Sequence, residues 1–130
     1  MTCPFCNIPE SDRIIETALL IGFYDRYPVG TGHMLLVPRR HVENWFDATK
    51  EEQSALMNAI DDAVTLIETR LDRQPDGYNV GFNAGEAAGQ TVMHLHLHVI
   101  PRFEGDIDDP RGGIRGAIPA KRIYEIKEEQ

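Results

Sequence analysis

Three histidines stand two residues apart in the stretch VMHLHLHVIPR, which covers residues 92–102. They are His94, His96 and His98, and they make up three of the five histidines in the chain. A leucine or a valine follows each of them. Because alternate side chains of a β-strand point to opposite faces, the spacing predicts that the three imidazoles share one face while the apolar residues meet the core.

Three imidazoles on one face can serve three purposes. They can simply form an exposed polar face that has no catalytic or binding role. They can also hold a metal ion, since histidine is the commonest metal ligand. Binding all three to one zinc would be strained, because the stretch spans about four steps of 3.3 Å and zinc holds nitrogens about 2 Å away. Two of them with distant ligands would fit more easily. The third purpose is attack on phosphorus by a neutral imidazole, which splits one displacement into two easier ones.

The segments around this stretch predict the sheet that must position it. Apolar, β-branched and aromatic residues favour strands in several places, separated by turns rich in Gly and Pro. The expected strands are residues 13–25, split in two near Thr17, then residues 33–38, 78–83 and 91–100, and a last one at residues 122–126.

One long helix is predicted between these strands. Thr49 and Glu52 have the spacing of a capping box, and apolar residues then recur every three or four positions from Leu56 to Leu71. The turn at residues 74–77 is expected to end the helix. An antiparallel sheet with a helix on one face makes the predicted fold class α+β.

Composition limits the partners of the chain. With 130 residues and 42% apolar residues, a single domain is expected. The formal net charge of −8 argues against a nucleic-acid-binding face, although a pocket for a small anion stays open. No basic, apolar leader and no run long enough to span a membrane is visible. We therefore expect a cytoplasmic protein whose two cysteines, Cys3 and Cys6, stay reduced.

The motif HLHLHVI fits the signature of the histidine triad (HIT) superfamily, in which histidines alternate with apolar residues. The similarity extends to FYDRYPVGTGHMLLVPRRHV (residues 23–42) and to NAGEAAGQTVMHLHLHVIPR (residues 83–102). The second block resembles the bacterial HIT and dinucleoside-polyphosphate hydrolase branches. The resemblance implies a HIT-like antiparallel sheet with one long helix and a short helix. It also implies a homodimer that joins the two sheets. The single domain would cover residues 1–130, with a core at about 3–103 and a C-terminal arm at 104–130.

The function implied by the resemblance is hydrolysis or transfer at the α-phosphate of a purine nucleotide conjugate, through a nucleotidyl-histidine. The conjugate would be a dinucleoside polyphosphate or a nucleoside phosphoramidate. No organic cofactor is implied, and Mg²⁺ would accompany a polyphosphate. Two alternatives stay open: a nucleotide sensor or scaffold without turnover, and a metallohydrolase that uses the histidines as ligands of a catalytic zinc.

By the same resemblance, His96 is the nucleophile and His98 contacts the phosphate, while His33 supports the triad from behind. The nucleotide site would comprise a ribose acceptor, phosphate-side contacts and an apolar slot for the base. These are Asp25 for the ribose, then Asn83, Gln90, Thr91 and His98 near the phosphate, and Phe5, Ile8 and Phe23 around the base. Several of these residues have a purely structural alternative: a turn former for Asp25, loop residues for Asn83 and Gln90, and core residues for the apolar side chains.

The two cysteines form a Cys-x-x-Cys pair, which is half of a zinc site. The resemblance implies that His41 and His94 complete it as a closed, structural Cys₂His₂ site. Only one histidine of the triad would then have to reach the ion. The alternatives are a redox-active pair or two idle thiols.

Overall fold

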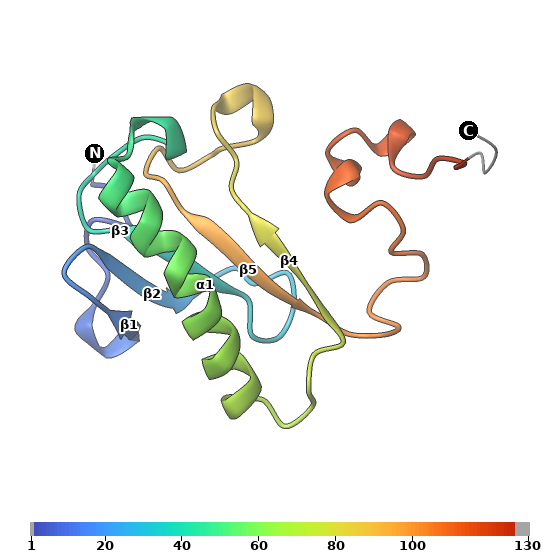
Figure 1. Cartoon of the computed structure of the whole chain (residues 1–130), viewed down its shortest axis with the longest axis horizontal. Coiled ribbons are helices and arrows are strands. Elements are labelled where there is room, and N and C mark those ends of the chain that lie inside the picture. The colour runs from blue at the N-terminus through green and yellow to red at the C-terminus, as the bar shows by residue number, and fades with distance from the viewer. Residues whose placement is uncertain (1, 127–130) are drawn as a thin grey trace.

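The computed structural model describes residues 2–126 and shows one five-stranded antiparallel sheet with a long helix, α1, across one face (Figure 1). This confirms the predicted α+β, HIT-like fold. The strands lie in the order β1-β2-β3-β5-β4. Their bounds are Arg13–Glu16 (β1), Leu20–Tyr24 (β2), Met34–Pro38 (β3), Gly77–Gly81 (β4) and Leu97–Arg102 (β5), and α1 covers Lys50–Arg70. The described residues also form five short 3₁₀ helices: Glu10–Asp12 (η1), Trp45–Asp47 (η2), Glu86–Ala88 (η3), Gly113–Ala117 (η4) and Pro119–Lys121 (η5).

The predicted capping box begins α1. The Thr49 hydroxyl accepts a hydrogen bond from the backbone N–H of Glu52, and the Glu52 carboxylate accepts one from the backbone N–H of Thr49. The buried Glu52 carboxylate also binds the Arg40 guanidinium at 2.8 Å, and this partner lowers the pKa of Glu52. The helix ends at Arg70, a few residues earlier than predicted, because Leu71 adopts an extended backbone.

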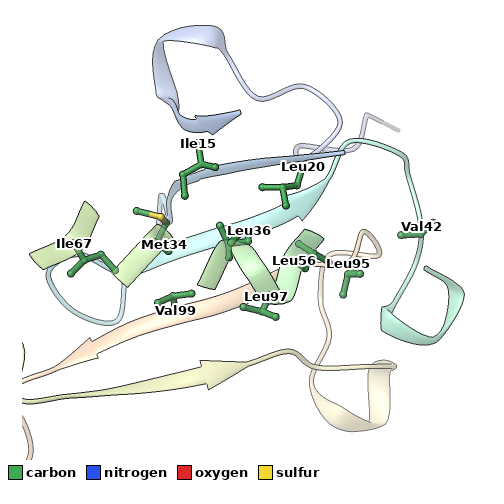
Figure 2. Close-up of a cluster of buried hydrophobic side chains, with 12 residues drawn as sticks. Ile15, Leu20, Met34, Leu36, Val42, Leu56, Ile67, Leu95, Leu97 and Val99 are labelled. Atoms are coloured by element: carbon green, nitrogen blue, oxygen red, sulfur yellow. The ribbon is translucent and has the colours of Figure 1, made fainter. Parts of the chain in front are cut away.

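Apolar side chains cover both faces of the central strands. Between α1 and the sheet, a cluster joins Leu56 and Ile67 of the helix to side chains from β2, β3 and β5 (Figure 2). On the other face, Phe23 and Leu35 belong to a second cluster that includes Ile8 of the N-terminal segment. This explains why β2 and β3 read as continuous apolar runs and not as alternating ones.

Strand β5 starts later than the sequence predicts. We expected a strand from residue 91, but the ladder begins at Leu97, so His94 and His96 precede it. The physical reason lies in the neighbouring strand, because Pro38 has no N–H to donate to a ladder. The Pro38 carbonyl accepts a hydrogen bond from the His94 ring at 2.8 Å instead. The histidines therefore do not sit on one regular strand face.

The C-terminal arm extends away from the sheet after β5 (Figure 1). The strand predicted at residues 122–126 is wrong, since these residues form no strand. The arm folds on itself instead: Arg115 donates to the Lys121 carbonyl, and Arg122 donates to the carbonyls of Asp109 and Arg111. The end of the predicted arm, residues 127–130, lies outside the described residues. Across residues 2–126, none of the helices has the length and apolar character needed to cross a membrane.

Candidate active site

A pocket of about 670 Å³ opens on the face of the sheet opposite α1. Most of the predicted nucleotide-binding and catalytic residues line it. These are Phe5, Ile8, Phe23, Asp25, Thr91, His96 and His98. Leu35 also lines it and escaped the sequence analysis, although it pairs directly with Phe23 and His98 in the sheet register. Knowledge of that register would have identified it.

His96 stands in the pocket wall with only 8% of its surface exposed. Its Nδ1 lies 2.8 Å from the backbone carbonyl oxygen of His94. Because a carbonyl only accepts hydrogen bonds, Nδ1 carries the proton of the neutral ring. The other nitrogen, Nε2, therefore holds a free lone pair. This is the tautomer that a nucleophilic imidazole requires.

His98 belongs to a chain of side chains that we call the relay, formed by Asp25, His33 and His98. The Nδ1 atom of His33 accepts from the backbone N–H of Val29 at 3.1 Å, so the His33 proton sits on Nε2. That Nε2 lies 2.9 Å from Nδ1 of His98 and 3.4 Å from a carboxylate oxygen of Asp25. His33 thus donates to Nδ1 of His98. The proton of neutral His98 is left on Nε2, where it can be donated to a ligand.

Burial keeps the two imidazoles of the relay, His33 and His98, neutral. It is the largest cause that lowers the pKa of His98 to about 4, and the neighbouring His96 and His33 rings add to it. Burial also lowers the pKa of His33, against the opposing effect of Asp25. Near pH 7 both rings are therefore uncharged, and His98 acts as a hydrogen-bond donor and not as a cation.

His94 belongs to a different group, which we call the cysteine cluster: Cys3, Cys6, His41 and His94. One ligand atom from each residue lies within 4.8 Å of all the others. Nδ1 of His94 lies 3.4 Å from Cys3 Sγ and 3.5 Å from Cys6 Sγ, and Nδ1 of His41 lies 3.2 Å from Cys6 Sγ. The structure therefore brings together all four predicted metal ligands.

The donor set of the cysteine cluster fits a tetrahedral zinc ion. Zinc–sulfur and zinc–nitrogen bonds of about 2.3 and 2.1 Å at a tetrahedral angle place sulfur and nitrogen about 3.6 Å apart, close to the observed separations. The proton of His94 sits on Nε2, which donates to the Pro38 carbonyl, so Nδ1 is free to bind metal. Burial lowers the pKa of His94, and a metal-binding imidazole must be neutral.

The relay fits a metal ion less well. Its ligand atoms also lie within 4.8 Å of one another, but the 2.9 Å between His33 Nε2 and His98 Nδ1 is a hydrogen-bond distance. Two nitrogens on one tetrahedral ion would lie about 3.4 Å apart. The triad is thus divided: His94 faces thiols, His98 faces His33, and His96 faces the pocket.

Two predicted phosphate-side residues do not line the pocket. Within residues 2–126, the hydrogen bonds of the buried Gln90 amide all go to backbone groups: it accepts from the N–H of Gly85 and donates to the carbonyls of Glu43 and Val92. Asn83 is exposed outside the pocket lining. In this structure Gln90 fixes the loop before the triad, and a phosphate contact by either residue stays a prediction.

Asp25 does line the pocket, but half of its carboxylate is already engaged. One oxygen accepts from the backbone N–H of Tyr27 at 2.9 Å. The other oxygen is the one next to His33. Both the ribose contact and the turn-forming alternative therefore remain compatible with its position.

Comparison with known proteins agrees with this geometry. The family model described as "HIT domain" matches residues 8–105. The chain belongs to the HIT domain family. The matched HIT domain includes the relay and His96, whereas Cys3 and Cys6 precede its first residue.

Among individual HIT proteins, the chain is 36% identical to "Protein hit" of Bacillus subtilis, over 80% of this chain and 74% of that protein. It is 32% identical to the adenosine 5'-monophosphoramidase of Schizosaccharomyces pombe, over 78% of this chain and 75% of the enzyme. A hypothetical histidine triad nucleotide-binding protein from Sulfolobus tokodaii has a similar structure, with a TM-score of 0.72 and 32% identity. That match covers 82% of this chain and 73% of the other.

Proposed function

We propose that the protein is a nucleotide hydrolase or transferase that acts at the α-phosphate of a purine nucleotide conjugate through a nucleotidyl-His96 intermediate. The observation that carries this proposal is the tautomer of His96. Its Nδ1 proton is held by the His94 carbonyl, and its free Nε2 lone pair belongs to a ring that lines a pocket large enough for a nucleotide.

The chemistry would proceed in two displacements. The lone pair on Nε2 of His96 forms a bond to the α-phosphorus, and the bond from phosphorus to the leaving group breaks as that group takes a proton from solvent, which the attacking water or acceptor returns in the second step. Water, or another acceptor, then attacks the same phosphorus and breaks the bond to nitrogen. This step releases the nucleoside monophosphate or its new ester and restores neutral His96. The proton on Nε2 of His98 would stabilise a phosphoryl oxygen in both steps.

The charge in the pocket guides the choice of substrate. Among the described residues that line it, Arg26 is the one permanent cation, and it is accompanied by Asp12 and Asp25. A nucleoside phosphoramidate carries little charge beyond its α-phosphate. A dinucleoside polyphosphate would need Mg²⁺ to offset the negative charge of its phosphate chain. The S. pombe relative is named an adenosine 5'-monophosphoramidase. A purine phosphoramidate is therefore our preferred substrate.

For the cysteine cluster we propose a structural zinc. Burial and the neighbouring Cys3 thiol raise the pKa of Cys6, and a bound cation would oppose this by favouring the thiolate form. Four protein ligands would leave no position open for substrate. The ion would anchor the N-terminal segment to the histidine stretch. A reducing cytoplasmic location and a homodimer with joined sheets belong to the same proposal.

The test is an assay of AMP release from adenosine phosphoramidate and from a diadenosine polyphosphate. We expect AMP from the phosphoramidate, in the presence and in the absence of Mg²⁺. Binding of AMP without any turnover would favour the sensor alternative. Rapid, reversible loss of turnover on chelation, with no change in the circular dichroism spectrum, would favour the catalytic-zinc alternative.

A further inference from the structure

The cysteine cluster and the pocket share one short segment. Cys3 and Cys6 bracket a tight turn in which the backbone N–H of Cys6 donates to the Cys3 carbonyl at 3.2 Å. We call residues 3–6 the metal loop. Its two central residues, Pro4 and Phe5, line the nucleotide pocket, while its two ends supply sulfur to the cluster.

Phe5 is the point at which the two sites touch. Its ring centroid lies 6.1 Å from that of His94, a predicted metal ligand, in an edge-on arrangement. It lies 5.0 Å from the His96 ring and 5.6 Å from the Phe23 ring, both in the pocket. A single half-buried aromatic side chain therefore contacts a metal ligand, the nucleophile and the base-side wall.

The metal loop is held by the cysteine cluster and by the packing of Phe5 against the second apolar cluster. Local hydrogen bonds close the turn on itself, and the Asn7 side chain donates to the Cys3 carbonyl. The side-chain contacts of the two cysteines reach His41 and His94, which lie 35 and 91 residues away in the chain. A link between such distant positions removes much of the conformational freedom of the segment. A metal ion bound there would fix the loop far more firmly than hydrogen bonds to thiols do.

We propose that Phe5 couples the two sites, so that zinc in the cysteine cluster and a nucleotide in the pocket strengthen each other's binding. This inference rests on the proposed function, because it requires the pocket to hold a nucleotide. Zinc orders the metal loop and seats Phe5 against Phe23 and His96. The nucleotide then meets a preformed wall and does not have to order it. Phe5 is a positioning residue in this account.

Coupling of this kind is reciprocal. If zinc tightens the binding of a nucleotide by some factor, the nucleotide must tighten zinc by the same factor. Couplings between two sites in one protein typically amount to about 5- to 150-fold. We therefore expect AMP to bind the zinc-loaded chain at least about tenfold more tightly than the zinc-free chain.

The first experiment measures the Kd of AMP by calorimetry with the zinc-loaded and the zinc-free chain, with circular dichroism to follow folding. A weaker Kd in the zinc-free chain supports the coupling. Equal Kd values for the two forms overturn it and leave the proposed function standing. No binding of AMP to either form overturns the proposed function and this inference together.

The second experiment keeps the zinc-loaded chain folded and uses Phe5→Ala, which retains all four cluster residues. The rate at which a chromogenic chelator removes zinc is measured with and without AMP at a saturating concentration. In the unchanged chain AMP should slow zinc loss by roughly the factor found for the Kd. In Phe5→Ala we expect zinc to bind one per chain and AMP to protect it by a factor close to one.

Phe46→Ala is the matched control. Phe46 is 76% exposed in η2, and its aromatic neighbour is Phe82, outside both the pocket lining and the cluster. This variant should keep the full protection of zinc by AMP. Protection that is as strong in Phe5→Ala as in the unchanged chain would overturn the role given to Phe5. An equal loss in both variants would overturn it as well.

Discussion

The cysteine cluster and the relay each contain one histidine of the triad, but the two imidazoles have different surroundings. His94 lies completely buried with two thiols beside its Nδ1, and a backbone carbonyl holds its other nitrogen. His98 has the Nε2–H of His33 at the corresponding nitrogen and keeps its own Nε2 for the pocket. The partner of Nδ1 therefore distinguishes the two imidazoles. His96, between them in the chain, has the His94 carbonyl at its Nδ1 and keeps a free lone pair on Nε2, as the proposed nucleophile requires.

The largest effect is expected from a substitution of His96. Asparagine at this position can still donate its amide to the His94 carbonyl, but it has no nucleophilic nitrogen. We expect His96→Asn to lower turnover of adenosine phosphoramidate by about 10³-fold or more. Kinetic assays should show this loss while the Kd of AMP and the melting temperature stay close to those of the unchanged chain. Turnover within tenfold of normal would remove His96 from the chemistry.

The cysteine cluster should respond mainly through stability and binding. We expect Cys6→Ser to lower the zinc content below one per chain and to reduce the free energy of unfolding by roughly 3 kcal/mol or more. Because the metal loop forms a wall of the pocket, KM should rise more than kcat falls. Metal analysis, urea unfolding and steady-state kinetics at low temperature test these three effects. A variant that keeps its KM and stability but loses kcat would instead indicate a catalytic ion.

The relay should respond through kcat. His33→Phe removes the donor to Nδ1 of His98, and the proton of His98 is then free to move to the wrong nitrogen. We expect kcat to fall by about 10- to 100-fold, with little change in the Kd of AMP. His33→Gln places an amide N–H near the same point and should recover part of the loss. If both variants lose the same activity, the hydrogen bond to His98 is not what matters.

The smallest effect concerns pH. The pKa of His98 is lowered from 6.5 to about 4 in the folded chain. Between these values the unfolded chain binds a proton that the folded chain does not, so stability falls as the pH falls and is regained as it rises. From pH 6.5 to pH 5 we expect His98 to contribute a loss of about 1 to 2 kcal/mol.

Urea unfolding across this range measures that loss, with His98→Asn as the variant that should flatten it. His33 also has a lowered pKa, so part of the slope should remain in His98→Asn. An unchanged slope in the variant would mean that His98 is protonated equally in both states.

Much of the fold followed from local patterns. The capping box at Thr49 and the apolar runs of β2 and β3 depend on neighbouring residues, and both are found as expected. The start of β5 did not follow, because it depends on Pro38, more than fifty residues away, and on the side chain of His94. The sequence could show that the histidines alternate, but not where the ladder would begin.

The candidate site also has parts that could be predicted from the sequence and parts that could not. The four residues of the cysteine cluster come together as the resemblance implied: His41 follows β3, His94 precedes β5, and the two cysteines lie in the N-terminal segment. Gln90 shows the limit. Its amide is engaged by the carbonyl of Glu43, which lies in a different loop, and no motif in the sequence encodes that contact. No pattern in the sequence indicated that Phe5 packs against both His94 and His96.

The most direct test is to trap the intermediate. The zinc-loaded chain is mixed with adenosine phosphoramidate, quenched in base after less than one turnover, and digested for mass spectrometry. Our account predicts one adenylyl group, attached to the peptide that contains the triad and located on His96, with none in His96→Asn. Turnover at a normal rate with no adduct, or an adduct on another residue, would contradict it.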